Sequence, residues 1–592
     1  MNDSTSISED NINLNGIAAS PGIAIGNIYL LGGDIVKVEP RSISESEVER
    51  EIERFNNAVE KTKLDFSAIR SEALRNLGEE SAQVFDAHQM MLEDEAVIEA
   101  TILKIKEDHI NADFAFFQVM ETFEYAFAGF KDEYMQARTV DLRDVKRRVI
   151  RNIQGGKRAD LGSLDNAAII VARDLTPSDT VSLDRSKVLG FATDLGSRAS
   201  HAAIMARSLE VPSVVGLKDV CAQVKTGDPV ILDGNRGVVI LHPDPRQIEE
   251  YQHIKHKYLE YSIKIKQNSS LPARTKDGKD IELSANLEFP NELTAVSTCG
   301  AKGIGLYRTE YLYLAKSELP TEDEQYEEYV QVAEGIFPNP VIIRTVDLGG
   351  DKIPDSLDIP SEENPFLGLR AIRLCLERPD FFETQLRAIL RASSKGNIKI
   401  LFPMISSLSE LRQSKEILDK VASELSEKNI PYDKNIEIGV MIEVPSASII
   451  ADLLAEECDF LSIGTNDLTQ YALAVDRGNE NIAHLYKNMS PAVIRLIQKT
   501  IFGGHSKGVW VGMCGEMAGD PLATMLLIGL GLDELSVSPI ILPEIKEIIR
   551  RVEFSESEKL ATKAMELRTS EEVEDYIQNV MKKKFKDLPL WS

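Results

Sequence analysis

The second half of the chain alternates short apolar segments with amphipathic helical patterns, and this alternation limits the possible folds more than any other feature. Eight segments between about residues 272 and 592 are rich in β-branched and apolar residues, and a helical pattern follows most of them. These segments are residues 281–286, 303–308, 341–347, 398–404, 437–443, 460–464, 509–514 and 534–538. Eight such units in one region predict a (β/α)8 TIM barrel. A doubly wound parallel sheet is the alternative.

Polar residues gather where these predicted strands end. They are Arg308, Arg344, Asp347, Glu443, Asn466, Asp467 and Cys514, and Arg477 lies just past the sixth strand. A barrel places the carboxyl ends of all its strands at one mouth. The sequence therefore predicts one polar site built from several strands.

The arginines of this set indicate an anionic ligand. A planar guanidinium donates two parallel hydrogen bonds to carboxylate or phosphate oxygens. Arg308, Arg344 and Arg477 at three strand ends suit a small molecule with several negative charges, although unrelated salt bridges with nearby acids are the alternative. Asn466 can donate its amide to a phosphate, or it can cap a helix.

Two carboxylates and one thiol complete the predicted site. Glu443 and Asp467 follow consecutive strands, and two carboxylates plus substrate oxygens are a typical Mg²⁺ environment. Pairing with the arginines is the alternative. Cys514 lies between glycines in Gly-Met-Cys-Gly-Glu, where a thiol with an ordinary pKa near ~8.5 can give a proton to an enolate. A buried, inert cysteine is the other interpretation.

The first half has a different character. Residues 14–30, and later segments 168–172, 188–192 and 229–234, read as strands and turns. From about 42 to 154 the pattern is helical. Its apolar stripe includes Val48, Ile52, Phe55, Ala58 and Val59, and the acidic residues Glu45, Glu47 and Glu51 are expected off that stripe.

These patterns predict a helical subdomain inserted into an α/β domain. We expect the α/β domain at 1–34 and 155–243, the helical insertion at 35–154, a charged helical linker at 244–271 and the barrel at 272–592. The whole chain is then a multidomain α/β protein.

His201 stands where a polar loop enters a helix. Ser200 is a plausible N-cap, so His201 would lie in the first helical turn. Backbone N–H groups and the positive helix end favour added negative charge there and disfavour imidazolium. A phosphate-accepting histidine needs these conditions, because its neutral nitrogen must attack. A solvated histidine beside a cap is the alternative.

Charge and composition exclude several classes of protein. The chain has 67 Lys and Arg against 95 Asp and Glu, a net charge of −28. This argues against nucleic acid or an anionic membrane as the main partner. Residues 1–15 lack the pattern of a signal peptide, apolar runs are too short to span a bilayer, and the five cysteines lack paired spacing. A soluble, reduced, cytoplasmic protein is expected.

At these residues the chain resembles enzyme I of the bacterial sugar phosphotransferase system, the phosphoenolpyruvate–protein phosphotransferase family. The histidine motif covers residues 196–216. The barrel motifs cover residues 303–310, 344–352, 364–368, 443–445, 463–467 and 513–516.

The resemblance implies a role for each candidate residue. His201 would accept the phosphoryl group through Nε2. Glu443 and Asp467 would hold Mg²⁺, and Cys514 would protonate the enolate to give pyruvate. The residues implied to bind phosphoenolpyruvate are Arg308, Arg344, Asn466, Asp467 and Arg477.

The resemblance also implies partners. The helical insertion would dock the carrier protein HPr, which receives the phosphoryl group from His201 in the first step of sugar phosphotransfer. The barrel would form a homodimer. The chain departs from the family at Ser197, Ala199 and Ala202, which stand where a glycine and two threonines are usual.

Two rival functions follow from the same motifs. Pyruvate phosphate dikinases and phosphoenolpyruvate synthases share the histidine and barrel domains but add an ATP-grasp domain. This chain lacks a glycine-rich nucleotide loop, and its first 150 residues lack the β-rich length of such a domain. The second rival, a non-catalytic scaffold, is disfavoured by the retained arginines, carboxylates and Cys514.

Overall fold

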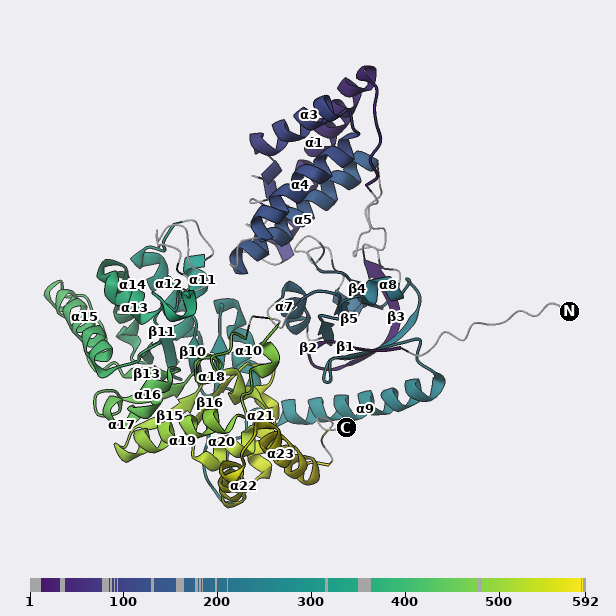
Figure 1. The fold of residues 1–592 in the computed structure, drawn as a ribbon. Helices are drawn as coiled ribbons and strands as arrows, with labels where there is room; N and C mark the ends of the chain where they lie inside the picture. Colours follow the sequence, from purple (N-terminus) through teal and green to yellow (C-terminus); the bar gives the residue numbers. More distant parts are fainter. Residues whose placement is uncertain are drawn as a thin grey trace. The chain divides into compact units, whose positions relative to one another are not determined.

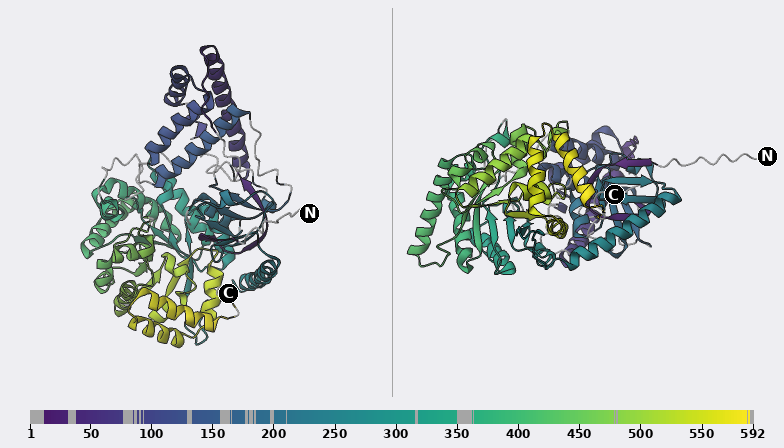
Figure 2. Two further views of the ribbon diagram at one scale, coloured as in Figure 1. Left: turned by 45° about the vertical axis from the view of Figure 1, so that its right-hand side comes forward. Right: turned by 90° about the horizontal axis from the view of Figure 1, so that it is seen from below.

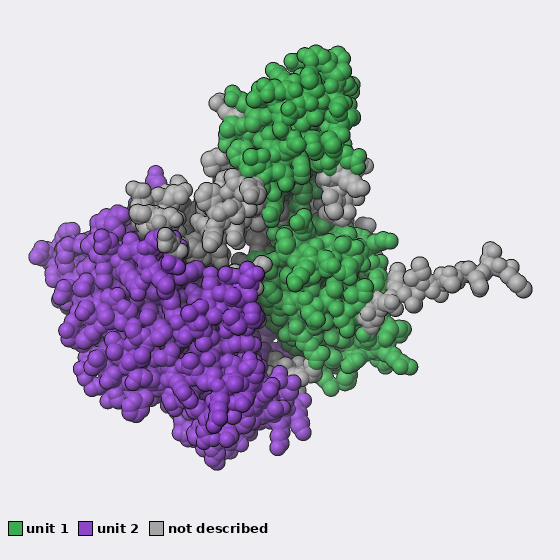
Figure 3. All heavy atoms as spheres, viewed as in Figure 1, with its two compact units in different colours: residues 1–260, 592 green, residues 261–591 purple. Residues whose placement is uncertain are grey.

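The structure is a computed structural model of the 592-residue chain, and it divides into two compact units, residues 1–260 with 592 and residues 261–591 (Figure 3). Each unit is described by itself. The described residues are 12–31, 38–76, 85, 88–89, 91–92, 94–128, 133–155, 164, 166–175, 179, 183, 185–196, 200–209, 211–314, 318–349, 362, 364–477, 479, 481–586 and 588.

The first unit contains the expected helical block (Figure 1, purple to blue). Its helices are α1 (Val48–Asn76), α3 (Glu95–Asp108), α4 (Ala112–Ala128) and α5 (Glu133–Gln154). The apolar stripe that the sequence predicts on α1 is buried in their shared core, as expected.

Glu51 corrects one detail of this block. From the sequence it is expected off the apolar stripe, but Glu51 follows Val48 by three residues and precedes Phe55 by four, so it lies on the same face of α1 and is buried. Its carboxylate accepts hydrogen bonds from Arg41, from Arg54 and from the backbone N–H of Ala112. These bonds replace the water that Glu51 loses on burial. They also join the start of α1 to the start of α4.

The rest of the first unit is built on one mixed sheet of eight strands, together with short helices such as α8 (Val220–Gln223). They are β1 (Ile12–Asn15), β2 (Ile17–Ser20), β3 (Ile23–Leu31), β4 (Ala168–Ala172), β5 (Val188–Thr193), β6 (Ser213–Val215), β7 (Pro229–Asp233) and β8 (Val238–Leu241). Their order in the sheet is β1-β8-β7-β3-β4-β5-β6-β2. Strand β3, before the helical block, pairs in parallel with β4, after it. The helical block is therefore an insertion into this α/β domain, as predicted.

A long helix, α9 (Pro245–Gln267), occupies the predicted linker. Near its start, Tyr251 packs in an apolar cluster of the eight-stranded sheet. Near its end, Tyr261 and Ile265 belong to the core of the second unit. The boundary between the units, at 260 and 261, falls between these two anchored ends.

The second unit is a closed parallel barrel, which excludes the doubly wound alternative. Its strands are β9 (Glu282–Leu287), β10 (Ile304–Tyr307), β11 (Val341–Arg344), β12 (Ile398–Phe402), β13 (Ile438–Ile442), β14 (Phe460–Ile463), β15 (Trp510–Met513) and β16 (Glu534–Val537). Each strand overlaps one predicted segment. Strand β16 pairs with β9 and closes the sheet.

Helices surround these strands (Figure 2). They are α10 (Leu293–Cys299), α11 (Glu310–Leu314), α12 (Glu322–Ile336), α13 (Ile372–Glu377), α14 (Pro379–Ala392), α15 (Leu408–Glu427), α16 (Pro445–Ile449), α17 (Ala451–Leu454), α18 (Thr465–Leu473), α19 (Pro491–Ser506), α20 (Thr524–Leu530), α21 (Leu542–Arg551), α22 (Phe554–Glu566) and α23 (Ser570–Lys584). No described helix is both long enough and apolar enough to span a bilayer.

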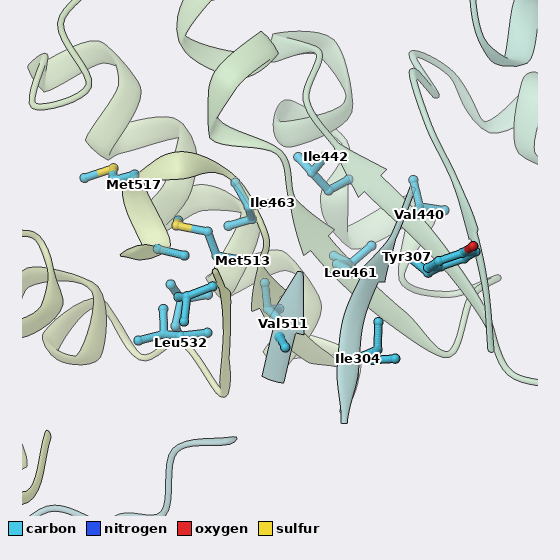
Figure 4. Close-up of a cluster of buried hydrophobic side chains, with 14 of the residues drawn as sticks. Ile304, Tyr307, Val440, Ile442, Leu461, Ile463, Val511, Met513, Met517 and Leu532 are labelled. Carbon is cyan, nitrogen blue, oxygen red and sulfur yellow. The ribbon is translucent and has the colours of Figure 1, made fainter. Parts of the chain in front are cut away.

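The strands alternate their side chains between two cores. Val440 and Ile442 of β13 point into the core that the strands share with the helices (Figure 4), whereas Met441 lies in a separate cluster with residues of four other strands. This alternation follows from the two-residue period of a strand. Most side chains on both faces of the sheet are thus apolar, although Ser284, Ser462 and Glu534 are buried polar residues within the strands.

Candidate active site

The carboxyl ends of the barrel strands hold the candidate residues. Arg344 is the last residue of β11, and Arg308, Glu443 and Cys514 come directly after β10, β13 and β15. Asn466 and Asp467 lie in the first turn of α18, which follows β14. Because the barrel is closed and parallel, all these positions lie at one mouth, as the sequence predicts.

Arg344 is the buried cation of this mouth. Its guanidinium lies 3.0 Å from Glu310 Oε2 and 3.3 Å from Asp347 Oδ2. Burial alone would lower the pKa of Arg344, but the carboxylates of Glu310, Asp347 and Glu443 outweigh it and raise the pKa above its usual range. Arg344 therefore stays charged. From the sequence, salt bridges with nearby acids are the alternative to a ligand-binding role for the arginines. Arg344 does form such salt bridges, and they lie inside the mouth.

Arg370 is a second buried cation, which the sequence analysis missed. Its Nη2 lies 3.0 Å from each carboxylate oxygen of Asp347, and its Nη1 lies 3.4 Å from Asp467 Oδ1 and 3.1 Å from the Tyr471 hydroxyl. The guanidinium also stacks over the ring of Phe366. A signal was present, because Arg370 comes two residues after the motif 364–368. It was overlooked because it follows no strand directly.

Glu443 is a buried carboxyl group among other carboxylates. Its Oε1 accepts the backbone N–H of Met404 at 2.6 Å. Burial raises the pKa of Glu443 to about 8; Asp467 and Asp347 add to the rise, and Arg344 and Arg370 oppose it. Such a crowded, dry carboxyl group favours a nearby positive charge.

The donor set near Glu443 suits a hard cation that has few protein ligands. The described residues include no cluster of three or more His, Cys, Asp or Glu side chains arranged to hold a metal. Mg²⁺ does not need one, because it keeps water and substrate oxygens in its coordination sphere. Glu443 and Asp467 therefore fit Mg²⁺ better than a metal that needs a complete protein cage.

Asn466 and Arg477 meet at a third side chain, Glu516. The Asn466 amide donates to Glu516 Oε1 at 3.2 Å, and Arg477 Nη1 lies 3.2 Å from the same oxygen. The backbone N–H of Glu516 donates to Asn466 Oδ1. The N-cap of α18 is Gly464, so the helix-cap alternative for Asn466 is excluded. Glu516 belongs to the motif 513–516 but is not among the residues that the sequence predicts for the site.

Arg308 lies at the exposed side of the mouth. It forms an ion pair with Glu288, which follows β9. More than a third of its side chain is exposed, in contrast to Arg344. The three predicted arginines therefore share one mouth but differ in their access to solvent.

Cys514 lies at the floor of the mouth and is buried. The hydroxyl of Ser462 donates to Cys514 Sγ at 3.3 Å. Burial raises the pKa of the thiol to about 11, against the opposing effects of Ser462, Arg344 and Arg308. This corrects the ordinary pKa assumed from the sequence. The thiol is fully protonated at neutral pH, so a proton is available, although from a weaker acid than expected.

In the first unit, helix α7 (His201–Ser208) begins at the candidate histidine. Ser200 takes the predicted N-cap position with an extended backbone. Ala202, Ala203 and Ala206 form the buried face of the helix. Ala202 is thus a core residue in this chain, whereas Ser197 and Ala199, the other two departures, lie outside the described residues.

Gly196 shapes the approach to this helix. Its φ of +117° is a conformation that other residues rarely adopt, and a Cβ there would lie 2.9 Å from the Ser200 hydroxyl oxygen. A side chain at Gly196 would therefore displace the N-cap residue.

The comparisons with known proteins agree with this arrangement. Three family models match: the PEP-utilising enzyme N-terminal domain over residues 15–138, the mobile domain over 164–237 and the PEP-binding domain over 263–554. Together they match more than half of the chain.

The similar full-length relatives carry one name, phosphoenolpyruvate-protein phosphotransferase. The protein from Staphylococcus carnosus is 42% identical over 96% of this chain and 99% of its own length. The protein from Haemophilus influenzae is 44% identical over the same shares. A solution structure titled as an Enzyme I protein is 46% identical over 41% of this chain and 99% of that chain, with a TM-score of 0.36. This chain, similar to these relatives along nearly its whole length, belongs to the phosphoenolpyruvate-protein phosphotransferase family.

Proposed function

We propose that this protein transfers the phosphoryl group of phosphoenolpyruvate to its own His201 and then to the carrier protein HPr. Pyruvate is released in the first transfer. One observation carries the proposal: the buried pair Arg344 and Arg370 lies with Asp347, Glu443 and Asp467 at one barrel mouth. Over 96% of its length, this chain is similar to relatives whose name states the donor.

The mouth suits a substrate that carries both phosphate and carboxylate. Arg308, Arg344, Asn466, Asp467 and Arg477 would bind phosphoenolpyruvate. Arg344 is the strongest candidate for the phosphoryl group, because it is buried and charged and its Nε has no hydrogen-bond partner among the described residues. A charged donor in a site that excludes water stabilises developing charge most effectively.

We propose that Glu443 and Asp467 hold Mg²⁺. Their crowded carboxylates fit a divalent cation, as argued above. When bound, the cation would offset charge on the transferring phosphoryl group. The negative charge of Glu443 and Asp467 would then be balanced by the cation as well as by Arg344 and Arg370.

The transfer itself needs a nucleophile and an acid. His201 Nε2 would attack phosphorus, so that a P–N bond forms while the bond between phosphorus and the enolate oxygen breaks. The enolate carbon would take the proton of Cys514 Sγ and become the methyl group of pyruvate. Solvent would reprotonate the thiolate. A pKa of about 11 ensures that the thiol carries its proton at neutral pH.

The experiment is phosphorylation of the purified protein with labelled phosphoenolpyruvate and Mg²⁺, with and without HPr. A phosphotransferase takes up the label by itself and passes it on to HPr. A scaffold takes none. A dikinase or synthase would also exchange the label with ATP, so ATP is included as a third arm.

Two partner assignments belong to the same proposal. The helical insertion at 35–154 would dock HPr, and the barrel would form a homodimer. Pull-down of HPr by fragments with and without the insertion tests the first. Sedimentation of residues 261–592 tests the second, and a barrel that stays monomeric at micromolar concentration would contradict it.

A further inference from the structure

Gln385, on α14, is a fully buried amide behind the strand ends of the candidate site. Its Oε1 accepts the backbone N–H of Val346 at 2.9 Å. Its Nε2 donates to the Thr309 hydroxyl and to the Tyr329 hydroxyl, each at 3.2 Å. One side chain therefore joins the segment after β10, which carries Arg308, to the segment after β11, which joins Arg344 to Asp347.

Two neighbours extend this connection to the site. The Thr309 hydroxyl donates to the backbone carbonyl of Arg344 at 3.0 Å. Glu310 accepts the backbone N–H of Asp347 at 2.9 Å and lies 3.0 Å from the Arg344 guanidinium. Thr309 thus holds the backbone of Arg344, and Glu310 holds its guanidinium. Gln385 in turn holds Thr309 and also Val346, which lies between Arg344 and Asp347 in the chain.

We infer that Gln385 is a positioning residue for phosphoenolpyruvate binding, acting through Thr309 and Val346 on Arg344 and Asp347. The inference rests on the proposed function, since it assigns Arg344 to the substrate. The hydrogen bonds of Gln385 go to Val346, Thr309 and Tyr329, none of which is a candidate ligand-binding residue. Its effect passes through two buried hydrogen bonds that have no solvent to replace them.

The chemistry of an amide explains why glutamine suits this position. The site requires one acceptor for Val346 and donors for Thr309 and Tyr329, and a neutral amide supplies them all. A carboxylate would lose the donors. Burial, with Glu328 and Glu310 adding to it, already raises the pKa of Tyr329, so a further negative charge would be unfavourable there. An apolar residue would leave the Val346 N–H unpaired.

The main test is Gln385→Met in the full-length protein. Pyruvate release is followed with a coupled lactate dehydrogenase assay in the presence of HPr and Mg²⁺. We expect the KM for phosphoenolpyruvate to rise about tenfold or more, because an error of about 1 Å in a binding group can cost on the order of a hundredfold. A purely structural role would lower the amount of active protein, and so the apparent kcat, with KM unchanged.

Gln325→Met is the matched control. Gln325 is also a buried glutamine of this network; it accepts from Tyr313 and Tyr329 and donates to the carbonyl of Pro320. These hydrogen bonds reach neither Thr309 nor Val346. We expect Gln325→Met to lose thermal stability to a similar degree but to keep the wild-type KM.

Two further substitutions keep the inference testable if Gln385→Met does not fold. Thr309→Val keeps the shape but removes the hydroxyl, and should raise KM; Thr309→Ser restores the hydroxyl and should rescue it. In Gln385→Glu, the protonated acid retains one donor and one acceptor, so its KM should approach the wild-type value at low pH and rise as the carboxyl ionises.

The outcomes are distinguishable. A KM within twofold of wild type for Gln385→Met, or for Thr309→Val where the first does not fold, would overturn the positioning role. A KM rise of equal size in Gln325→Met would overturn it as well, because the effect would then be general loosening. A wild-type protein that takes no label from phosphoenolpyruvate would overturn the proposed function and, with it, this inference.

Discussion

The smallest unit of the proposed mechanism is His201 at the start of α7. We predict that His201→Ala abolishes phosphorylation and leaves the fold intact, because Ala202, Ala203 and Ala206 provide the buried face of the helix. Mass spectrometry of the labelled protein and circular dichroism are the measurements. His256→Ala, at an exposed position on α9, is the control. Label on another histidine, such as His88, in the His201→Ala protein would rule out the assignment.

Cys514→Ala should separate the two half-reactions. Exchange of phosphate between His201 and HPr does not involve the enolate, so it should survive. Turnover of phosphoenolpyruvate should fall steeply, because the buried thiol that supplies the proton is gone. Pyruvate production and HPr exchange are measured in parallel on the same preparation. Pyruvate formation at the wild-type rate would mean that water or another acid is the donor.

Asp467→Ala should raise the barrier to transfer from phosphoenolpyruvate. Electrostatic stabilisation of this kind is worth several kcal/mol, so we expect a loss of at least about a hundredfold in kcat/KM. The substitution also removes a partner of Arg370. The rate is measured against Mg²⁺ concentration. An Asp467→Ala protein that is fully active in excess EDTA is the result that would refute the metal assignment.

At the scale of an element, β16 carries a buried acid whose ionisation should oppose folding. Glu534 packs against two glycines of other barrel strands. A Cβ added at Gly305 would lie 2.8 Å from Glu534 Oε1, and a Cβ added at Gly512 would lie 2.7 Å from Glu534 Oε2. Burial raises the pKa of Glu534 to about 7; Ser284 and Lys399 oppose the rise, and Glu282 adds to it.

The sign of the effect follows from linkage. The folded state holds this proton more tightly than the unfolded state, so stability should fall as pH rises from about 4.5 to 7 and then level off. Glu534→Gln should therefore stabilise the barrel at pH 8, by up to about 3 kcal/mol, and the gain should shrink toward pH 5. Melting of the barrel at both pH values is the measurement, with Glu558→Gln, at an exposed position on α22, as control. An equal gain at both pH values would contradict the ionisation argument.

At the scale of the whole molecule, the proposed nucleophile and the proposed substrate site lie in different units. His201 belongs to residues 1–260, and the candidate substrate-binding residues belong to residues 261–591. His201 must therefore reach the barrel mouth to collect phosphate and HPr to deliver it, and α9 is the candidate hinge.

A cut in α9 tests this division of labour. A cut near 265, within the linker that the sequence predicts at 244–271, would remove Tyr261 from the barrel core. The cut therefore belongs between Ile254 and Tyr261. We expect fragment 1–257 to exchange phosphate with phosphorylated HPr but to accept none from phosphoenolpyruvate. Fragment 258–592 should bind phosphoenolpyruvate with Mg²⁺. Each is assayed with labelled donor. Efficient labelling of 1–257 by phosphoenolpyruvate alone would place the substrate site outside the barrel.

The sequence by itself determined the elements and most of the chemistry at the barrel mouth. Strand and helix periods are local properties, so the eight barrel segments, the helical insertion and the start of α7 at His201 could all be read from the chain. Once a strand is predicted, the residue at its carboxyl end is predicted with it. The sequence could therefore place Arg308, Arg344, Glu443 and Cys514 at the barrel mouth. The roles of these residues remain predictions that the experiments above address.

Only the tertiary structure decided how distant segments meet. Pairing of β16 with β9 closes the barrel, and no local pattern distinguishes this from an open sheet. Arg370 reaches Asp347 and Asp467 from a segment that follows no strand, so strand ends could not point to it. Burial set the pKa of Cys514, because desolvation depends on every neighbour in space and not on neighbours in sequence. The backbone N–H of Ala112, which donates to buried Glu51, likewise comes from a segment distant in sequence.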